Sequence, residues 1–167
     1  MGEAMEFYLR KAGWGDADLL FAWANDKDVR KNSFSERQIT YEEHKSWFRK
    51  KILDRDTQVY LFCQGKQEKG MLRLEDHGNC VEISYSIAAG ERGKGYGQKL
   101  ILLAEAEICQ RFQRRRGAAG SHAGQEKPQE IAAVARVKEE NLASNRIFAK
   151  LGYEKHGTEY RKRIYCQ

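Results

Sequence analysis

The stretch of this chain best suited to chemistry is Arg92-Gly93-Lys94-Gly95-Tyr96-Gly97. It lies between a strand-like run, Val81 to Ala88, and a helix-like run, Gln98 to Arg116. A glycine turn ahead of a helix lets backbone N–H groups approach a ligand, and the helix dipole adds about half a positive charge there. The stretch therefore predicts a site for an anion such as a pyrophosphate.

The spacing of the glycines excludes two familiar phosphate loops. A Walker loop ends in Gly-Lys-Ser/Thr, but Gly97 is followed by Gln98 and Lys99. A dinucleotide fingerprint has G-x-G-x-x-G, whereas Gly93, Gly95 and Gly97 are spaced G-x-G-x-G. A glycine-rich solvent turn is the alternative that these residues leave open.

Length and charge limit the class of protein. The 167 residues suit a single domain, residues 1–167. With 30 basic and 24 acidic residues, the net charge is +6, which favours acidic ligands. No basic face is interleaved with aromatic residues, so we expect no nucleic-acid partner. No apolar run approaches the length of a membrane span, so we expect no membrane partner and a cytoplasmic location.

The cysteines and histidines give no sign of a metal or redox site. Cys63, Cys80, Cys109 and Cys166 are scattered without a C-x-x-C pair, which predicts buried free thiols in a reducing compartment. His44, His77, His122 and His156 lack the spacing of metal ligands, so we expect no metal.

Hydrophobic periodicity predicts strands and helices in alternation. The expected strands are 5–11, 57–64, 69–75, 79–88, 131–137 and one or two within 153–166; the expected helices follow Asp16, then 41–52, 98–116 and 141–152. Thr40 and Glu43 form a capping box for the second helix, and Asn141 caps the last. Residues 117–129, rich in Gly, Ala, Ser and charge, are expected to form a mobile loop.

Two motifs in this order resemble those of the GNAT N-acetyltransferases. The first is Arg-x-x-Gly-x-Gly, carried by Arg92, Gly95 and Gly97. The second is Asn141 followed by a short helix ending in Leu151-Gly152-Tyr153. The resemblance implies an α/β fold: a mixed central sheet, splayed between its fourth and fifth strands, with helices on both faces.

The same resemblance implies acetyl-CoA as cosubstrate. Its pantetheine would pair with main-chain groups near Ile87 and Ala88, its pyrophosphate would meet the loop from Arg92 through Gly93, Lys94, Gly95 and Tyr96 to Gly97, and Asn141 would hydrogen-bond the pantetheine arm. The amine would attack the thioester directly, so the protein needs a base and oxyanion donors but no nucleophile of its own.

Glu82 is our candidate for the base, directly or through a water, because Ser84 and Ser86 share its polar face of the strand. Alternatively, Glu82 faces solvent or braces a helix. The resemblance implies a tyrosine acid within the last helix, but that position is Phe148. The role of protonating the thiolate then falls to Tyr153, another tyrosine or solvent.

The acceptor is inferred from the N-terminal half. The segment Trp23 to Phe34, with Ile39 to Phe48, resembles PseH-like transferases, which acetylate the 4-amino group of a UDP-linked amino-dideoxy sugar. Arg30 would then bind the diphosphate, and Trp23 or Phe34 would stack on the base. The alternative for the aromatic residues of this half is core packing.

Two other functions stay open. Similar segments occur in transferases that act on the N-termini of ribosomal proteins, so a peptide acceptor is one alternative. A non-catalytic module that senses acyl-CoA is the other, because Phe148 removes the usual acid. A homodimer is also left open.

Overall fold

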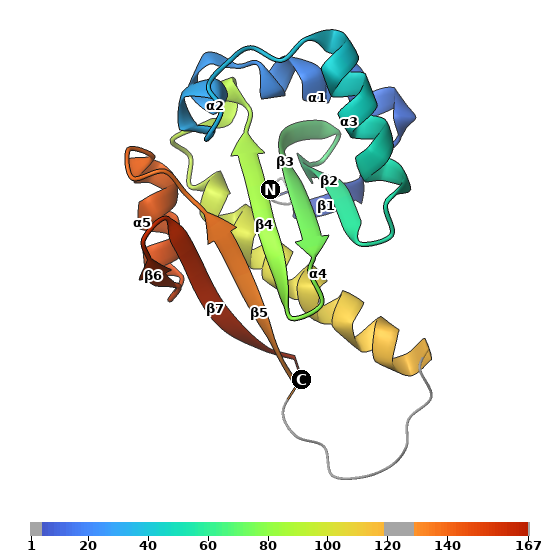
Figure 1. Ribbon diagram of the computed structural model, residues 1–167, viewed down its shortest axis with the longest axis vertical. Helices are drawn as coiled ribbons and strands as arrows, with labels where there is room; N and C mark the ends of the chain where they lie inside the picture. The colour runs from blue at the N-terminus through green and yellow to red at the C-terminus, as the bar shows by residue number, and fades with distance from the viewer. Residues whose placement is uncertain (1–4, 119–128, 167) are drawn as a thin grey trace.

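The computed structural model describes residues 5–118 and 129–166 (Figure 1). Its elements are β1 Phe7–Lys11, α1 Ala17–Ala24, α2 Lys27–Asn32, α3 Tyr41–Leu53, β2 Thr57–Gln64, β3 Gln67–Asp76, β4 Cys80–Ile87, α4 Tyr96–Ala118, β5 Gln129–Arg136, α5 Leu142–Lys150, β6 Glu154–His156 and β7 Glu159–Cys166; short 3-10 turns occupy Trp14–Asp16 and Ala89–Glu91. The predicted order is confirmed, apart from one additional helix. Of the expected loop 117–129, residues 119–128 lie outside the described residues.

The additional helix is α2, in the stretch Asn25 to Phe34, where the apolar period of the preceding helix breaks. Asp26 caps it, since its carboxylate accepts hydrogen bonds from the N–H groups of Asp28 and Val29. The helix has only six residues and buries none of them, so it lacks an apolar stripe from which periodicity could have predicted it.

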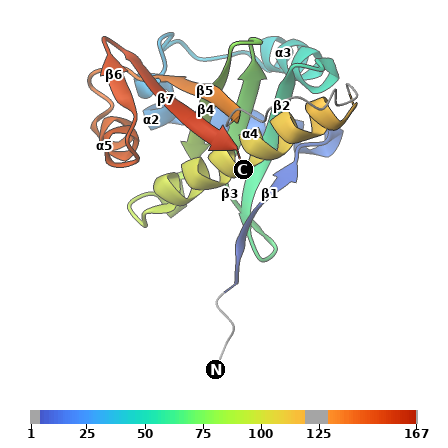
Figure 2. The same cartoon turned by 90° about the horizontal axis from the view of Figure 1, so that it is seen from below.

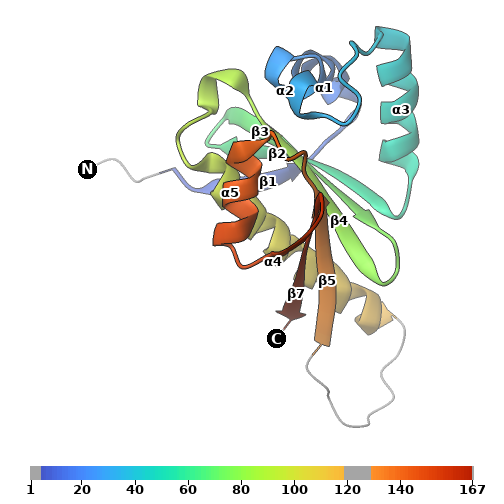
Figure 3. The ribbon, with the colours of Figure 1, turned by 60° about the vertical axis from the view of Figure 1, so that its left-hand side comes forward.

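The sheet has the strand order β1-β2-β3-β4-β5-β7-β6 and is mixed, with β4 and β5 as its parallel pair. These two strands pair only from Cys80 to Glu82 on one side and from Ala132 to Val134 on the other. Beyond Glu82, β4 continues to Ile87 without a partner on that edge, and the two strands diverge (Figure 3). The predicted splayed α/β sheet is confirmed.

Helices cover both faces of the sheet because the central strands are apolar on both sides. In β2, Val59, Leu61 and Cys63 pack with Leu20 of α1 and Phe48 of α3. The alternate residues Tyr60 and Phe62 join the larger core, to which α4 contributes Leu100, Ile101, Ala104 and Ile108. Accordingly, α4 crosses the face opposite α3 (Figure 2).

Two of the predicted helix caps, those of α3 and α5, are confirmed. At the start of α3, the Thr40 hydroxyl accepts from the N–H of Glu43 at 3.3 Å, and the Glu43 carboxylate accepts from the N–H of Thr40 at 2.9 Å. At the start of α5, Asn141 Oδ1 accepts from the N–H of Ser144 at 3.2 Å.

The prediction of four free cysteines is wrong for two of them. Cys109 of α4 and Cys166 of β7 form a disulfide, whereas Cys63 and Cys80 are free and buried as expected. The two bonded residues are 57 positions apart, so only the packing of β7 against α4 brings them together. Cysteine usage therefore no longer argues for a reducing compartment.

Candidate active site

A cleft of about 1570 Å³ opens where β4 and β5 diverge. Its walls come from α1, α2, α3, β3, β4, β5, α5 and the loop before α4. The structure brings together eleven of the predicted site residues in this cleft: Trp23, Arg30, Phe34, Glu82, Ile87, Arg92, Gly93, Gly95, Tyr96, Gly97 and Asn141. Ala88, Lys94 and Tyr153 are not among its lining residues.

The loop before α4 has the geometry expected for an anion site. Gly93 and Gly95 both adopt φ +75°, a conformation that residues with a Cβ rarely adopt. An added Cβ at either glycine would meet no atom within 4 Å, so their backbone faces open space. The 23-residue helix α4 begins directly afterwards at Tyr96, which directs its N-terminal dipole toward that space.

The side chains of this loop are less available than its backbone. Lys94 Nζ lies 2.9 Å from Glu91 Oε2, an interaction that raises the lysine pKa. Arg92 donates from Nε to the Ile87 carbonyl at 3.1 Å, and its other nitrogens pair with Asp28 at 2.9 Å and Asp26 at 2.5 Å. In this loop, the backbone N–H groups are therefore more available to an anion than the side chains of Arg92 and Lys94.

The free edge of β4 offers further backbone groups. Ala88 donates its N–H to the Lys69 carbonyl at 2.9 Å, so that group already has a partner. Peptide groups alternate in direction along a strand, so those of β4 between Glu82 and Ile87 that point toward β5 face the cleft without a strand partner. A ligand amide lying in the opening would satisfy them.

Glu82 stands at the apex of the opening, as the last residue of β4 that pairs with β5. Its carboxylate is largely buried, with 16% of the side chain exposed. Arg136 of β5 donates to Oε1 from Nε at 3.2 Å and from Nη2 at 3.1 Å, while His77 Nε2 lies 3.4 Å from Oε2. Sequence reasoning identified Glu82 but missed Arg136, which only the pairing of β4 with β5 brings near.

Tyr153, the tyrosine named in the prediction of an acid, does not line the cleft. Tyr153 is buried among Phe148 and Tyr160, and its hydroxyl lacks a hydrogen-bond partner within the described residues. Burial, and after it the charge of Glu105, raises the pKa of Tyr153. Phe148 is buried and packs against Tyr85, whose ring centroid is 6.1 Å away.

Tyr85 of β4 is the tyrosine that the structure brings to this position in the cleft. It lines the cleft, and its hydroxyl lies 2.8 Å from the Ser144 hydroxyl of α5. Burial raises its pKa, so the phenol is protonated at neutral pH. The sequence did not predict this residue, because Tyr85 lies on the apolar face of its strand with Ile83 and Ile87, where a core residue is expected.

The acceptor side of the cleft holds Arg30, but not as a free cation. Its Nε donates to the Ala24 carbonyl at 2.6 Å, and Nη1 and Nη2 donate to the Ser35 carbonyl and the Ser33 hydroxyl, both at 3.0 Å. Burial lowers its pKa, which Arg37 lowers further. Arg30 therefore braces the loop after α2 and has little capacity left for a phosphate.

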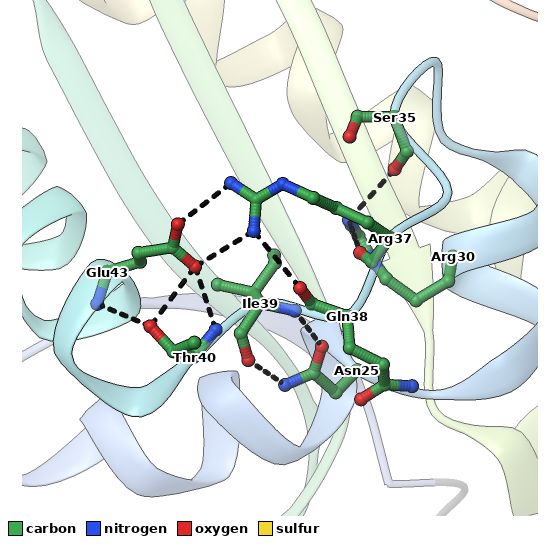
Figure 4. Close-up of polar contacts among 8 residues, drawn as sticks. All are labelled: Asn25, Arg30, Ser35, Arg37, Gln38, Ile39, Thr40 and Glu43. Carbon is green, nitrogen blue, oxygen red and sulfur yellow. Dashed lines mark hydrogen bonds and ion pairs between the residues drawn. The ribbon is translucent and has the colours of Figure 1, made fainter.

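The rest of that loop is held by its own polar contacts (Figure 4). Asn25 exchanges two hydrogen bonds of 2.8 Å with the backbone of Ile39. Arg37 pairs with Glu43 at 2.8 Å, and this contact, with the Thr40 cap, lowers the pKa of Glu43 to about 2. Phe34, 61% exposed, lines the cleft from the same loop.

The described residues contain neither a metal-binding cluster nor a membrane-spanning helix. Within residues 5–118 and 129–166, no cluster of three or more His, Cys, Asp or Glu side chains is arranged to hold a metal ion. Across the same residues, no helix is both long and apolar enough to cross a membrane.

Comparison with solved structures identifies acetyltransferases of the same fold. Spermidine N-acetyltransferase from Vibrio cholerae, solved with CoA and spermine, superposes with a TM-score of 0.73 at 18% identity, over 95% of this chain and 94% of that one. The aminoglycoside acetyltransferase AAC(6')-Ib, solved with coenzyme A, gives 0.69 at 15% identity over 94% of both chains. An N-acetyltransferase from Staphylococcus aureus Mu50 superposes with a TM-score of 0.69 at 18% identity, over 95% of this chain and 99% of that one.

Comparison of the sequence with curated proteins gave no significant match. The profile of the acetyltransferase (GNAT) domain, in contrast, matches residues 6–154, which is most of the chain. That match covers the glycine turn, the splayed strands and the capped helix α5. The chain therefore belongs to the GNAT family of acetyltransferases.

Proposed function

We propose that this chain transfers the acetyl group of acetyl-CoA directly to the primary amine of a small acceptor, which enters from the side of α1, α2 and α3. The observation that carries the proposal is the turn Gly93–Gly95, which presents open backbone ahead of α4 at the end of the free β4 edge. Backbone N–H groups from Gly93 to Gly97 would hold the pyrophosphate. Unpaired peptide groups of β4 and the side chain of Asn141 would hold the pantetheine arm.

In this proposal Glu82 removes the proton from the acceptor ammonium, directly or through a water. Its place at the apex of the opening supports the role, because both ligands meet where the two strands separate. Arg136 orients the carboxylate through Oε1 and leaves Oε2 beside His77. His77 is half exposed and offers the proton a route to solvent.

Tyr85 replaces Tyr153 as our candidate for the acid. When the C–S bond breaks, the Tyr85 hydroxyl would give its proton to the thiolate and recover one from solvent through Ser144. The 2.8 Å contact between the two hydroxyls and their place in the cleft support this role. A thiolate leaves moderately well without help, so the gain from an acid is modest.

The acceptor in this proposal is a small primary amine. The superposed structures include a spermidine and an aminoglycoside acetyltransferase, which supports a small amine. The UDP-amino sugar suggested by Trp23 to Phe34 loses its proposed diphosphate ligand, because Arg30 is engaged with backbone carbonyls. Aromatic walls at Trp23, Phe34 and Trp47 suit a sugar ring or an ammonium equally.

A direct test combines calorimetry with an assay of thiol release. CoA should bind the wild-type protein, and acetyl-CoA should be consumed faster when a suitable amine is added. The acceptor panel should contain spermidine, kanamycin, a UDP-4-amino-4,6-dideoxy sugar and a peptide with a free N-terminus. CoA binding without amine-dependent turnover on any member would favour the non-catalytic module.

A further inference from the structure

Helix α2 is held at its two ends by cations from opposite arms of the splayed sheet. At its N-terminal end, Arg92 from the loop after β4 pairs with Asp26 and Asp28 at 2.5 and 2.9 Å. At its C-terminal end, Lys138 from the segment after β5 donates to the Lys31 carbonyl at 2.9 Å and pairs with Glu36. Figure 1 shows α2 beside the end of β4 where the two strands separate.

These two ties matter because they join a short, exposed helix to the segments that follow the two diverging strands. Six residues are too few for a helix to be stable alone, and none of the six is buried. Its other contacts run to α1, where Arg30 Nε donates to the Ala24 carbonyl at 2.6 Å, and to the loop that follows, where Arg30 contacts Ser33 and Ser35; these contacts do not join α2 to β4 or β5. The cations thus fix α2 on the sheet.

Residues downstream of α2 form much of the acceptor wall. Val29, Ser33, Phe34 and Arg37 all line the cleft. Val29, Ser33 and Phe34 follow the position of α2, because residues 26–35 are not part of the sheet. The contacts of Asn25 with Ile39 and of Arg37 with Glu43 hold only the end of the loop that leads into α3. A shift of α2 would therefore move the acceptor wall and leave the glycine turn in place.

The contacts of Arg92 point to a role other than binding the pyrophosphate. Three of its nitrogens already donate to Ile87, Asp28 and Asp26. We propose that Arg92 and Lys138 are positioning residues, which hold α2 and residues 33–39 as the acceptor wall, and that the pyrophosphate is bound by backbone N–H groups without the guanidinium. The kinetic part of this inference rests on the proposed function, whereas its structural part does not.

Hydrogen exchange tests the structural part without an acceptor. In Arg92→Ala and in Lys138→Met, amides of residues 27–39 should exchange about tenfold faster than in the wild type, while those of α3 remain unchanged. Arg163→Met is the matched control: it removes a surface ion pair with Glu130, and neither residue lines the cleft. Lys138→Arg, which keeps the charge, should restore slow exchange.

Calorimetry with CoA separates positioning from phosphate binding. The proposal expects Arg92→Ala to bind CoA within threefold of the wild type and, in turnover, to raise the acceptor KM about tenfold with a smaller change in kcat. If Arg92→Ala is poorly folded, Asp28→Asn replaces it, since Asp28 is 65% exposed and should show the same shifts more weakly. CoA affinity lowered tenfold or more in Arg92→Ala, with unchanged exchange in residues 27–39, would overturn the proposal. So would a wild-type acceptor KM in both Arg92→Ala and Lys138→Met.

Discussion

The two sides of the cleft are built by different means. On the cofactor side, the free groups are backbone N–H and C=O groups, presented by two glycines with φ +75° and by a strand edge without a partner. On the acceptor side, the lining groups are side chains, and three cations that face it, Arg30, Arg37 and Arg92, are already engaged with carbonyls or carboxylates.

This difference indicates which part of the site tolerates change. Backbone groups keep their position when side chains are replaced, because the sheet and α4 determine where they lie. The acceptor side depends on a network of polar contacts around a short helix, in which one substitution can move several lining residues. We therefore expect cofactor binding to be robust and acceptor choice to be variable.

The largest expected effect comes from the apex, where the two sides meet. Glu82→Gln should lower kcat by roughly 10²–10⁴-fold and leave CoA affinity unchanged, because the amide cannot accept the ammonium proton. The deficit should shrink at high pH, where the amine loses its proton to solvent. Glu68→Gln, an acid that does not line the cleft, is the control. Activity of Glu82→Gln within threefold of the wild type would exclude a role as base.

On the cofactor side, we expect CoA affinity to fall only when a substitution changes the backbone of the glycine turn. Gly95→Val should weaken CoA binding on the order of 100-fold, because valine cannot adopt φ +75° without strain and its side chain would fill the open space above the turn. Gly157→Val is a matched control: Gly157 also has positive φ and open space, but lies in the turn between β6 and β7. Equal loss of CoA affinity in both variants would mean that the effect is one of folding.

A smaller effect is expected from the acid. Tyr85→Phe should lower kcat about tenfold without changing CoA affinity, and Phe148→Tyr in the same chain should restore part of the loss by returning a hydroxyl near Ser144. Tyr160→Phe removes a buried hydroxyl bonded to Asn145 and serves as control. A Tyr85→Phe enzyme with wild-type kcat at every pH would remove Tyr85 from the mechanism.

The smallest expected effect is on the pH dependence of folding stability, through His44 on the acceptor side. His44 is buried against Phe48 and donates to the Ala17 carbonyl at 2.9 Å, and burial lowers its pKa below 6.5. The unfolded chain therefore binds a proton near pH 6.5 that the folded chain does not. Stability from His44 is complete above that pH and is lost as pH falls toward the folded pKa, with a slope of at most about 1.4 kcal/mol per pH unit. Urea unfolding of His44→Phe should lack this part of the pH dependence; an unchanged slope would contradict it.

The sequence was sufficient for features that depend on local pattern. Alternation predicted β4, the capping box predicted α3, and the glycine spacing predicted the open turn at Gly93 to Gly97. Features created by tertiary packing were missed: the Arg136 partner of Glu82, the Tyr85 contact with Ser144 and the Cys109–Cys166 disulfide join residues at least 54 positions apart. Arg30 was recognised as a cation, but not that its own loop would engage it.

The most direct test of the proposed function measures acetyl transfer and CoA binding on the same preparation. We expect CoA to bind and Gly95→Val to abolish most of this binding. We also expect a small amine from the panel to accelerate thiol release in the wild type, and the amine-dependent rate of Glu82→Gln to be lower by at least about 10²-fold. Acetylated amine should form in equal amount to the free thiol. Thiol release that is independent of every amine, with CoA affinity unaffected by Gly95→Val, would contradict the central claim.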